Sequence, residues 1–274
     1  MRKYPDNLTI KTQAGFSLVD VMVGMVIALL GVIIIFQVFS VSEGIRRTTT
    51  SGGDALQNGA LALFTLERSL KQAGYGLFTA ANLGALAADP PGTAPVAITA
   101  GAPANLSDSI ALRYRQNWDF GPFPPDPAVF ASAVPPALTV ENITVAFNNN
   151  SPRLVSDVNG VISDGIVLLK AEYGTDADSD GVVDTWTRAV PGNVLSVLAV
   201  RLAVVARSAQ PEKPSVLGGA CDTTTVFPTW IDSAAVPLDL SANVGLVGGT
   251  DNWKCYRYKT FETTVSLRNV MWRP

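Results

Sequence analysis

The sequence predicts an α+β fold in which one long amino-terminal helix precedes an antiparallel β-sheet domain with long loops. Three observations lead to this prediction. An apolar run fills residues 16–41, a helical pattern continues to about residue 75, and short β-branched segments separated by Pro, Gly, Asn and Asp occupy residues 76–274. We therefore expect a leader over residues 1–15, one long helix over 16–75 and one globular domain.

The leader carries more Arg and Lys than Asp and Glu. By the positive-inside tendency it stays on the cytoplasmic side of a bilayer, so the globular domain is expected to be exported. A secretory signal peptide is cut after its apolar stretch. Here the distinctive step from Gly15 to Phe16 lies before the stretch. Cleavage at that step leaves the apolar segment on the mature protein.

The apolar run over residues 16–41 is long enough to cross a hydrocarbon core of about 30 Å, which takes about 20 helical residues. Asp20 is the one charged residue in it. An unpaired carboxylate in lipid costs at least about 2.5 kcal/mol, so we expect Asp20 to have a partner. Two plainer interpretations stay open: Asp20 is hydrated near the lipid headgroups, or the whole segment is an ordinary membrane anchor.

The segment GFSLVDVMVG, residues 15–24, resembles the signal of type IV pilins and of type II secretion pseudopilins. The resemblance implies that a prepilin peptidase cuts after Gly15 and that the new amino-terminal Phe16 is methylated. Such proteins usually have Glu at the fifth mature position, where this chain has Asp20. The implied role of Asp20 is to neutralise the amino terminus of a neighbouring subunit during assembly.

Beyond the apolar run the helical pattern is weakest at Ser51, Gly52 and Gly53, which could bend or locally melt the helix. An apolar stripe then resumes over residues 56–73, and Gly74 is a stop signal. A helix over residues 16–73 would be about 87 Å long, too long for one compact domain. Its first half must therefore pack against other molecules.

The exported domain contains five strand-like runs. They are SIALRYR (109–115), LTVENITVAF (138–147), GIVLLKAEYG (165–174), VLSVLAVRLAVVAR (194–207) and YKTFETTVSLRNVMW (258–272). Their β-branched content and the turn residues between them predict an antiparallel sheet. The run at 194–207 is also long enough to be a helix, and its periodicity does not decide between the two.

Three segments of this domain resemble the PilW family of minor type IV pilins, which is related to the J component of the type II secretion pseudopilus. They are LLKAEYGTDADSDGVVDTW (168–186), VLAVRLAVVARS (197–208) and CYRYKTFETTVSLRNVMW (255–272). The resemblance implies a pilin-like fold. In that fold the first half of the long helix packs in a bundle with other subunits, and the second half lies across a β-sheet.

The resemblance also implies a role, a location and partners. PilW-type proteins act with other minor pilins to start pilus assembly, at the tip and with a large tip adhesin. The precursor would be a single-pass inner-membrane protein with its carboxyl-terminal domain in the periplasm, and would then enter a surface pilus. The implied partners are the prepilin peptidase, the other minor pilins, the major pilin and the tip adhesin. The alternatives are a J-type pseudopilin of a type II secretion system and a pilus-borne adhesin or DNA-binding subunit.

Composition argues against catalysis. The chain has no His, which removes Ser-His-Asp and Cys-His arrangements and the commonest general base. Its formal net charge is −3, without a basic run after residue 47, so no nucleic-acid partner is expected. We predict a protein that is not an enzyme and needs no cofactor.

The two cysteines, Cys221 and Cys255, are too few for a four-thiolate zinc site and too far apart in sequence for a CxxC redox motif. In an exported domain they meet an oxidising compartment, and a disulfide between them is expected. Such a bond would close a loop of about 35 residues and stabilise the fold by roughly 3 to 4 kcal/mol. Two separate buried thiols are the alternative.

The residues Asp176, Asp178, Asp180, Asp184 and the carbonyl of Val182 form the sharpest chemical pattern. Alternate carboxylates followed by Gly can wrap a hard cation such as Ca²⁺, as in the first half of an EF-hand loop. The twelfth loop position is not Glu and the flanks are not paired helices, so the site would be structural and not an EF-hand. The alternative is a hydrated acidic turn between strands.

Aromatic residues are the remaining candidates for recognition. They are Trp118, Phe120, Phe123, Trp230 and Trp253. They could form a ligand-binding or adhesin surface, but scattered aromatic residues more often pack in cores and loops. The paired carboxylates of the acidic turn lack an apolar pocket that would raise one pKa, so glycoside hydrolysis is not expected.

Overall fold

The computed structural model describes residues 15, 17–75, 77, 94–102, 106–115, 138–148, 151–214, 218–241 and 252–271. The chain divides into two units, of which the first ends at Thr49 and the second begins at Thr50. The first unit contains the amino-terminal part of the long helix, and the second contains the rest of that helix and all of the strands.

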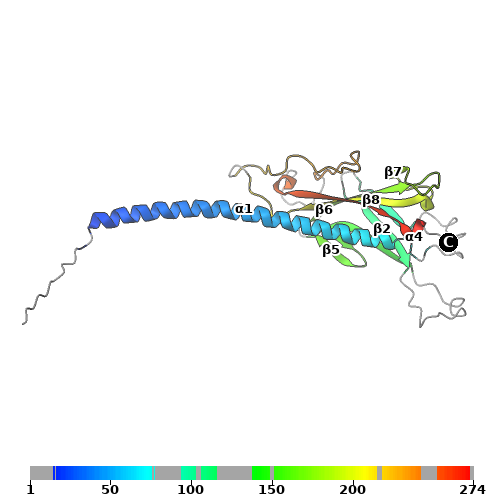
Figure 1. Cartoon of the computed structure of the whole chain (residues 1–274), viewed down its shortest axis with the longest axis horizontal. Helices are drawn as coiled ribbons and strands as arrows, with labels where there is room; N and C mark the ends of the chain where they lie inside the picture. The colour runs from blue at the N-terminus through cyan, green and yellow to red at the C-terminus, as the bar shows by residue number, and fades with distance from the viewer. Residues whose placement is uncertain are drawn as a thin grey trace, which may run out of the picture. The chain divides into compact units, whose positions relative to one another are not determined.

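The described elements follow the expected order, helix first and strands afterwards (Figure 1). The α-helices are α1 (Leu18–Gln72) and α4 (Arg268–Met271), and the short 3-10 helices are η2 (Val194–Ser196) and η3 (Asn252–Cys255). The strands are β1 (Val96–Thr99), β2 (Ser109–Arg115), β3 (Leu138–Asn148), β4 (Ser151–Ser156), β5 (Gly160–Asp164), β6 (Ile166–Thr175), β7 (Thr185–Thr187), β8 (Val197–Arg207) and β9 (Tyr258–Ser266).

Helix α1 begins at Leu18 because Ser17 caps it. The Ser17 hydroxyl accepts a hydrogen bond from the backbone N–H of Val19, and the Ser17 carbonyl accepts one from Asp20. The helix continues through Ser51, Gly52 and Gly53, where a bend or local melting was considered. Ser51 is 6 % exposed, so this turn packs within the second unit, and that packing outweighs a cost of about 1 kcal/mol per glycine.

All strand pairs in the described residues are antiparallel, which confirms the predicted α+β class with an antiparallel domain. The strands form two sheets where the sequence suggested one. A five-stranded sheet has the order β1-β2-β3-β4-β5, and a four-stranded sheet has the order β7-β6-β8-β9. We call them sheet A and sheet B.

The structure decides one alternative that the sequence left open and corrects one expected strand. Residues 197–207 form β8, the strand at the centre of sheet B beside β6, so the helical alternative is wrong. The run at 258–272 was expected to be one strand, but β9 ends at Ser266 and a helical turn, α4, begins at Arg268. Strands β1, β4, β5 and β7 were not predicted, because each is short and lies among turn residues.

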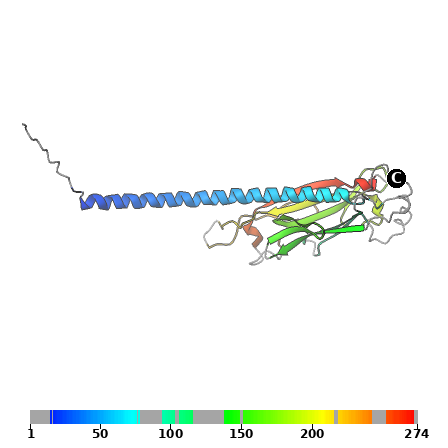
Figure 2. The same ribbon diagram turned by 90° about the horizontal axis from the view of Figure 1, so that it is seen from below.

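The main core lies between the carboxyl-terminal half of α1 and the two sheets. In Figures 1 and 2 this half of the helix runs alongside the strands. It buries Ala55, Ala62, Leu66, Leu70 and Ala73 against residues of β1, β2, β3, β4, β6, β8 and β9. The predicted apolar stripe is confirmed at Leu66, Leu70 and Ala73. Towards its start the prediction is wrong, because Leu56 and Ala60 are exposed and the buried residues are Ala55 and Ala62.

The edge of β6 opposite β8 is covered by residues that precede β2. The backbone N–H of Asp108 donates to the carbonyl of Leu169, and the Leu169 N–H donates to the Ser107 hydroxyl at 3.0 Å. The Ala171 N–H donates to Oδ2 of Asp108 at 3.0 Å. Backbone and side-chain atoms of Ser107 and Asp108 thus continue the hydrogen bonding of β6 and join the start of sheet A to sheet B.

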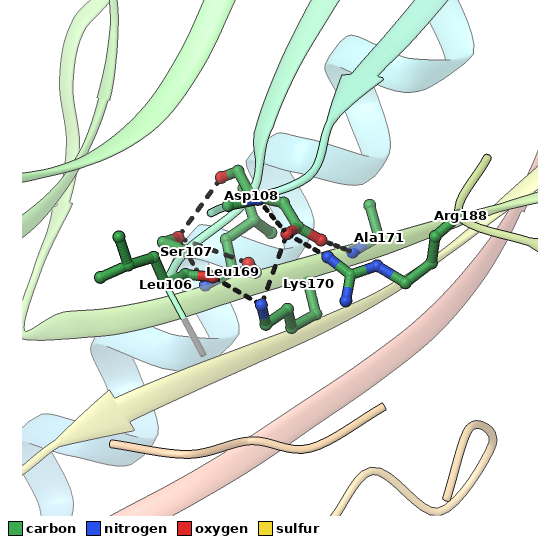
Figure 3. A network of polar contacts seen from close by, with 8 residues as sticks. Leu106, Ser107, Asp108, Leu169, Lys170, Ala171 and Arg188 are labelled. Carbon is green, nitrogen blue, oxygen red and sulfur yellow. Dashed lines mark hydrogen bonds and ion pairs between the residues drawn. The ribbon is translucent and has the colours of Figure 1, made fainter. Parts of the chain in front are cut away.

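Two cations compensate the Asp108 carboxylate, whose side chain is fully buried. Lys170 Nζ lies 3.4 Å from Oδ1, and Arg188 makes a short ion pair with the same oxygen (Figure 3). Burial lowers the pKa of Lys170, and the charge of Asp108 opposes that shift only in part. Loss of Asp108 would leave the buried Lys170 without a counter-charge, which costs about 3 to 5 kcal/mol.

At Gly59 the backbone of α1 closely approaches a side chain of sheet B. A Cβ at this position would overlap the ring of Phe261 on β9. By contrast, Gly53 has open space around it and is exposed. The two glycines of the same helix therefore form a matched pair for testing how α1 docks.

We expect Gly59→Ala to destabilise the protein by about 1 to 3 kcal/mol, because the ring of Phe261 must move in a packed interior. Gly53→Ala should instead stabilise it by roughly 0.5 to 1 kcal/mol, because alanine is the better helix former. Urea unfolding of the full-length protein in detergent measures both. Equal stabilisation by the two substitutions would contradict this account of the contact.

Candidate functional site

The first candidate region is the amino-terminal end of α1. Gly15 is exposed, and Asp20 is exposed in the first turn of the helix. Phe16 lies outside the described residues. The partial positive charge of a helix amino terminus favours a carboxylate in that turn, so the position of Asp20 is compatible with the helix whether or not a partner is bound.

The apolar segment that follows is left uncovered by the described residues of its own unit. Every large apolar side chain from Leu18 to Ile45 is exposed. This helix is long and apolar enough to cross a membrane by length and composition. A helix that is apolar around its whole circumference is stable only when lipid or other apolar helices cover it.

The second candidate region is the Asp-rich turn, residues 176–184, which connects β6 to β7. Both carboxylate oxygens of Asp176 accept backbone hydrogen bonds, Oδ1 from Ser179 at 2.6 Å and Oδ2 from Gly181 at 2.9 Å. Asp184 accepts a hydrogen bond from the Ala177 N–H at 2.7 Å. Gly181 has φ +88°, a left-handed conformation that suits glycine. The turn is therefore organised around its carboxylates.

Three of the four carboxylates converge. One oxygen from each of Asp176, Asp178 and Asp184 lies within 4.8 Å of the others. Asp180 is not in this group, and its Oδ1 accepts a hydrogen bond from the Val182 N–H at 2.8 Å. The structure thus brings together three of the four acidic residues that the sequence singled out, and Val182 lies exposed beside them.

The pKa values of two of these groups move in opposite directions. Burial alone would raise the pKa of Asp176, but the N–H groups of Gly181 and Ser179 outweigh it, and the pKa lies below its ordinary value. For Asp178 the Asp180 N–H lowers the pKa, but the nearby negative charges of Asp180 and Asp184 outweigh it, and the pKa is raised. Negative charge is thus held at Asp176 and disfavoured at Asp178.

The third candidate region is a strap over the outer face of sheet B, which we define as residues 218–241. Cys221 in the strap forms a disulfide with Cys255 of η3, with their Cα atoms 4.8 Å apart. The expected disulfide is therefore present in the structure. The strap buries Trp230, Val236, Leu238 and Leu240 against Val167, Leu168, Ala203, Val205 and Trp253, which form a second core.

The structure describes two of the five aromatic residues that the sequence offered as candidates for recognition. Trp230 is 1 % exposed and Trp253 is 6 % exposed, so both pack in the core, as the sequence interpretation favoured, and the alternative of a binding surface is wrong for them. The ring of Trp253 packs against Phe227 with centroids 4.5 Å apart. Trp118, Phe120 and Phe123 lie outside the described residues.

The sequence interpretation missed the charged pair beneath the strap. Glu172 of β6 and Arg201 of β8 are direct neighbours across sheet B, and Arg201 Nε donates to Glu172 at 2.6 Å. Glu172 lies in a largely apolar strand that also contains Lys170, and Arg201 lies at the middle of a largely apolar strand that ends in Arg207. Opposite charges inside two apolar runs are the signal that could have identified them, because buried charges in a sheet need partners across strands.

The described residues combine a long helix, apolar and exposed in its first half, with an antiparallel β-sheet domain. Comparison with protein families gives a match to the Type IV Pilus-assembly protein W family over residues 136–269. The predicted resemblance to this family is thereby confirmed over β3 to α4. The match supports a minor pilin related to the type IV pilus and an association with the cell envelope.

The chain was also compared with solved structures and with curated protein sequences. A solved structure, the type IV-like pilin TTHA1219 from Thermus thermophilus, is similar to this chain with a TM-score of 0.40 and 14 % identity, covering 80 % of this chain and 97 % of that one. No curated protein sequence matches the chain.

The Asp-rich turn should be sensitive to acid. Because the pKa of Asp176 in the folded protein is below its ordinary value of about 3.9, its carboxylate stabilises the turn above that pH and loses this contribution as the pH falls towards the lower pKa. The amide resonances of Ser179 and Gly181, followed through an acid titration, should report a midpoint below about 3.9. In Asp176→Asn that transition should disappear, and a midpoint at or above 3.9 in the wild type would contradict the assignment.

Proposed function

We propose that this protein is a minor pilin that promotes the initiation and assembly of type IV pili, in a tip complex with other minor pilins. The observation that carries the proposal is the exposed apolar helix over Leu18–Ile45, attached to a chain whose carboxyl-terminal half matches a pilus-assembly family. Such a helix is held by lipid before assembly, and by the apolar helices of other subunits afterwards. Its role is structural, without catalysis or a required cofactor.

In this proposal the chain has three functional parts. Residues 1–15 are a leader that prepilin peptidase removes between Gly15 and Phe16, after which Phe16 is methylated. Residues 16–75 form the assembly helix, which crosses the inner membrane at about residues 16–41. Residues 76–274 form the periplasmic body, which reaches the cell surface with the pilus. The proposed partners are other minor pilins, the major pilin and a tip adhesin.

A clean deletion in the native organism tests the proposal. Sheared surface pili and the profile of secreted proteins would be scored side by side, with wild-type complementation as the control. Loss of pili with normal secretion is the expected result. Loss of secretion with normal pili would overturn it in favour of a J-type pseudopilin. Normal pili and secretion, with lost attachment or DNA binding, would favour an adhesin or DNA-binding subunit.

Gly15→Leu should block processing, because the proposed peptidase cuts directly after this residue. The variant should remain a membrane-bound precursor that still carries residues 1–15. Intact-mass analysis of the purified protein distinguishes it from a mature chain that begins with methylated Phe16. Ser17→Ala, two residues further on, should be cut normally. Normal processing of Gly15→Leu would show that the cleavage site is wrong.

Asp20→Ala should be cleaved normally but enter pili poorly. If Asp20 pairs with the amino terminus of a neighbour in an apolar environment, the loss of one partner costs more than about 1.4 kcal/mol, and incorporation should fall by about tenfold or more. Asp20→Glu keeps the charge and should assemble. Quantitative immunoblots of sheared pili, normalised to the membrane pool, measure both variants. Equal incorporation of the Ala and Glu variants would refute the pairing.

We also propose that the Asp-rich turn binds calcium through Asp176, Asp178 and Asp184. The convergence of their oxygens supports this, because Ca²⁺ prefers carboxylate and carbonyl oxygens and would relieve the repulsion between these groups. The carboxylate oxygens that already accept backbone hydrogen bonds each retain a second lone pair. The carbonyl of Val182 and the carboxylate of Asp180 are further candidate ligands.

Calcium should raise the melting temperature of metal-free full-length protein in detergent. At a concentration 100 times the dissociation constant, the stabilisation would be about 2.7 kcal/mol. Asp178→Asn should weaken the effect, while Asp164→Asn, an exposed acid on β5, should leave it unchanged. The absence of any shift in the wild type during calcium titration would exclude this site.

A further inference from the structure

The strap inserts one deeply buried ring, that of Trp230, against sheet B. Trp230 is the largest fully buried side chain in the described part of the chain. Its indole N–H has no hydrogen-bond partner among the described residues. The ring is therefore held by packing and by the cation beside it, because the guanidinium of Arg201 lies 5.7 Å from its centroid.

The same guanidinium also contacts the β6–β7 hairpin. It lies 4.6 Å from the ring centroid of Trp186 on β7. Trp186 in turn packs on Gly174 of β6, where a Cβ would come 2.8 Å from its ring. Arg201 thus contacts two tryptophans that belong to different segments, one from the hairpin that carries the Asp-rich turn and one from the strap.

Arg201 has little freedom to move. Its side chain is 15 % exposed, and it forms an ion pair with Glu172, whose side chain is 7 % exposed. Because separating a buried charge from its partner is costly, the guanidinium is held by Glu172 of β6, and both rings lie close to it. A shift of one ring changes the position that is best for the cation, and therefore the contact with the other ring.

We propose that Arg201 couples the β6–β7 hairpin to the strap, so that the packing of Trp186 controls how firmly Trp230 and its neighbours are held on sheet B. Ile231, directly after Trp230, is 83 % exposed. The hairpin therefore influences how the strap presents a residue at the molecular surface. The coupling is between two surface segments of the exported domain and does not depend on the role proposed for the protein.

A second anchor of the strap is independent of the hairpin. Glu262 on β9 accepts hydrogen bonds from the backbone N–H groups of Ile231 and Asp232, at 3.0 and 3.3 Å. Glu262→Gln should loosen the strap without involving Trp186. Contacts without a shared partner usually have additive effects, so this variant provides the comparison for the coupling through Arg201.

Hydrogen exchange of the full-length protein in detergent, measured on peptides that cover residues 222–241, tests the coupling. Trp186→Leu should speed exchange in the strap about 2- to 5-fold, the factor that corresponds to one cation–π contact. Trp186→Phe should have a smaller effect and keeps the hairpin packed. Thr185→Ala, the preceding exposed residue of β7, is the matched control and should leave the strap unchanged.

A double-mutant cycle decides the mechanism. In a Glu172→Gln/Arg201→Met background, Trp186→Leu should have no further effect on strap exchange. In a Glu262→Gln background, the effect of Trp186→Leu should add to that of Glu262→Gln. Unchanged strap exchange in Trp186→Leu would overturn the proposal. An equal effect of Trp186→Leu with and without Arg201, or an equal effect of Thr185→Ala, would also overturn it. Unchanged exchange of residues 197–207 confirms that sheet B stays folded in each variant.

Discussion

At Leu169 and Ala171, the backbone groups on the edge of β6 opposite β8 need hydrogen-bond partners. A buried backbone group without a partner costs as much free energy as a lost hydrogen bond. Asp108 and Ser107 provide these partners, and this places the start of β2, and with it sheet A, beside sheet B. The carboxylate that does this is buried and requires Lys170 and Arg188. Arg188 follows β7, so the same cluster also holds the hairpin that carries the Asp-rich turn.

Sheet B is covered on both faces by segments from opposite ends of the chain. The carboxyl-terminal half of α1 covers one face, and Gly59 allows the ring of Phe261 to approach the helix backbone. The strap covers the other face, and the disulfide between Cys221 and Cys255 closes it. Strand β8, at the centre, is therefore apolar on both faces, which explains why its sequence lacks the alternation of a half-exposed strand.

The exposed surface of the apolar helix contrasts with this closed domain. The domain buries two apolar cores of its own, while the segment over Leu18–Ile45 leaves every large apolar side chain uncovered. A protein built in this way depends on an external apolar environment, first lipid and then other helices in our proposal.

The sequence by itself determined the long helix, its apolar first half, the antiparallel class, the disulfide and the acidic turn, because each depends on local periodicity, turn chemistry or residue type. It did not determine the two-sheet division, the end of β9 at Ser266 or the burial of Trp230 and Trp253. Nor did it indicate that Arg201 would lie against Trp186 and Trp230. Those features arise from residues far apart in the chain, and only the packing of α1 and the strap on opposite faces of sheet B brings them together.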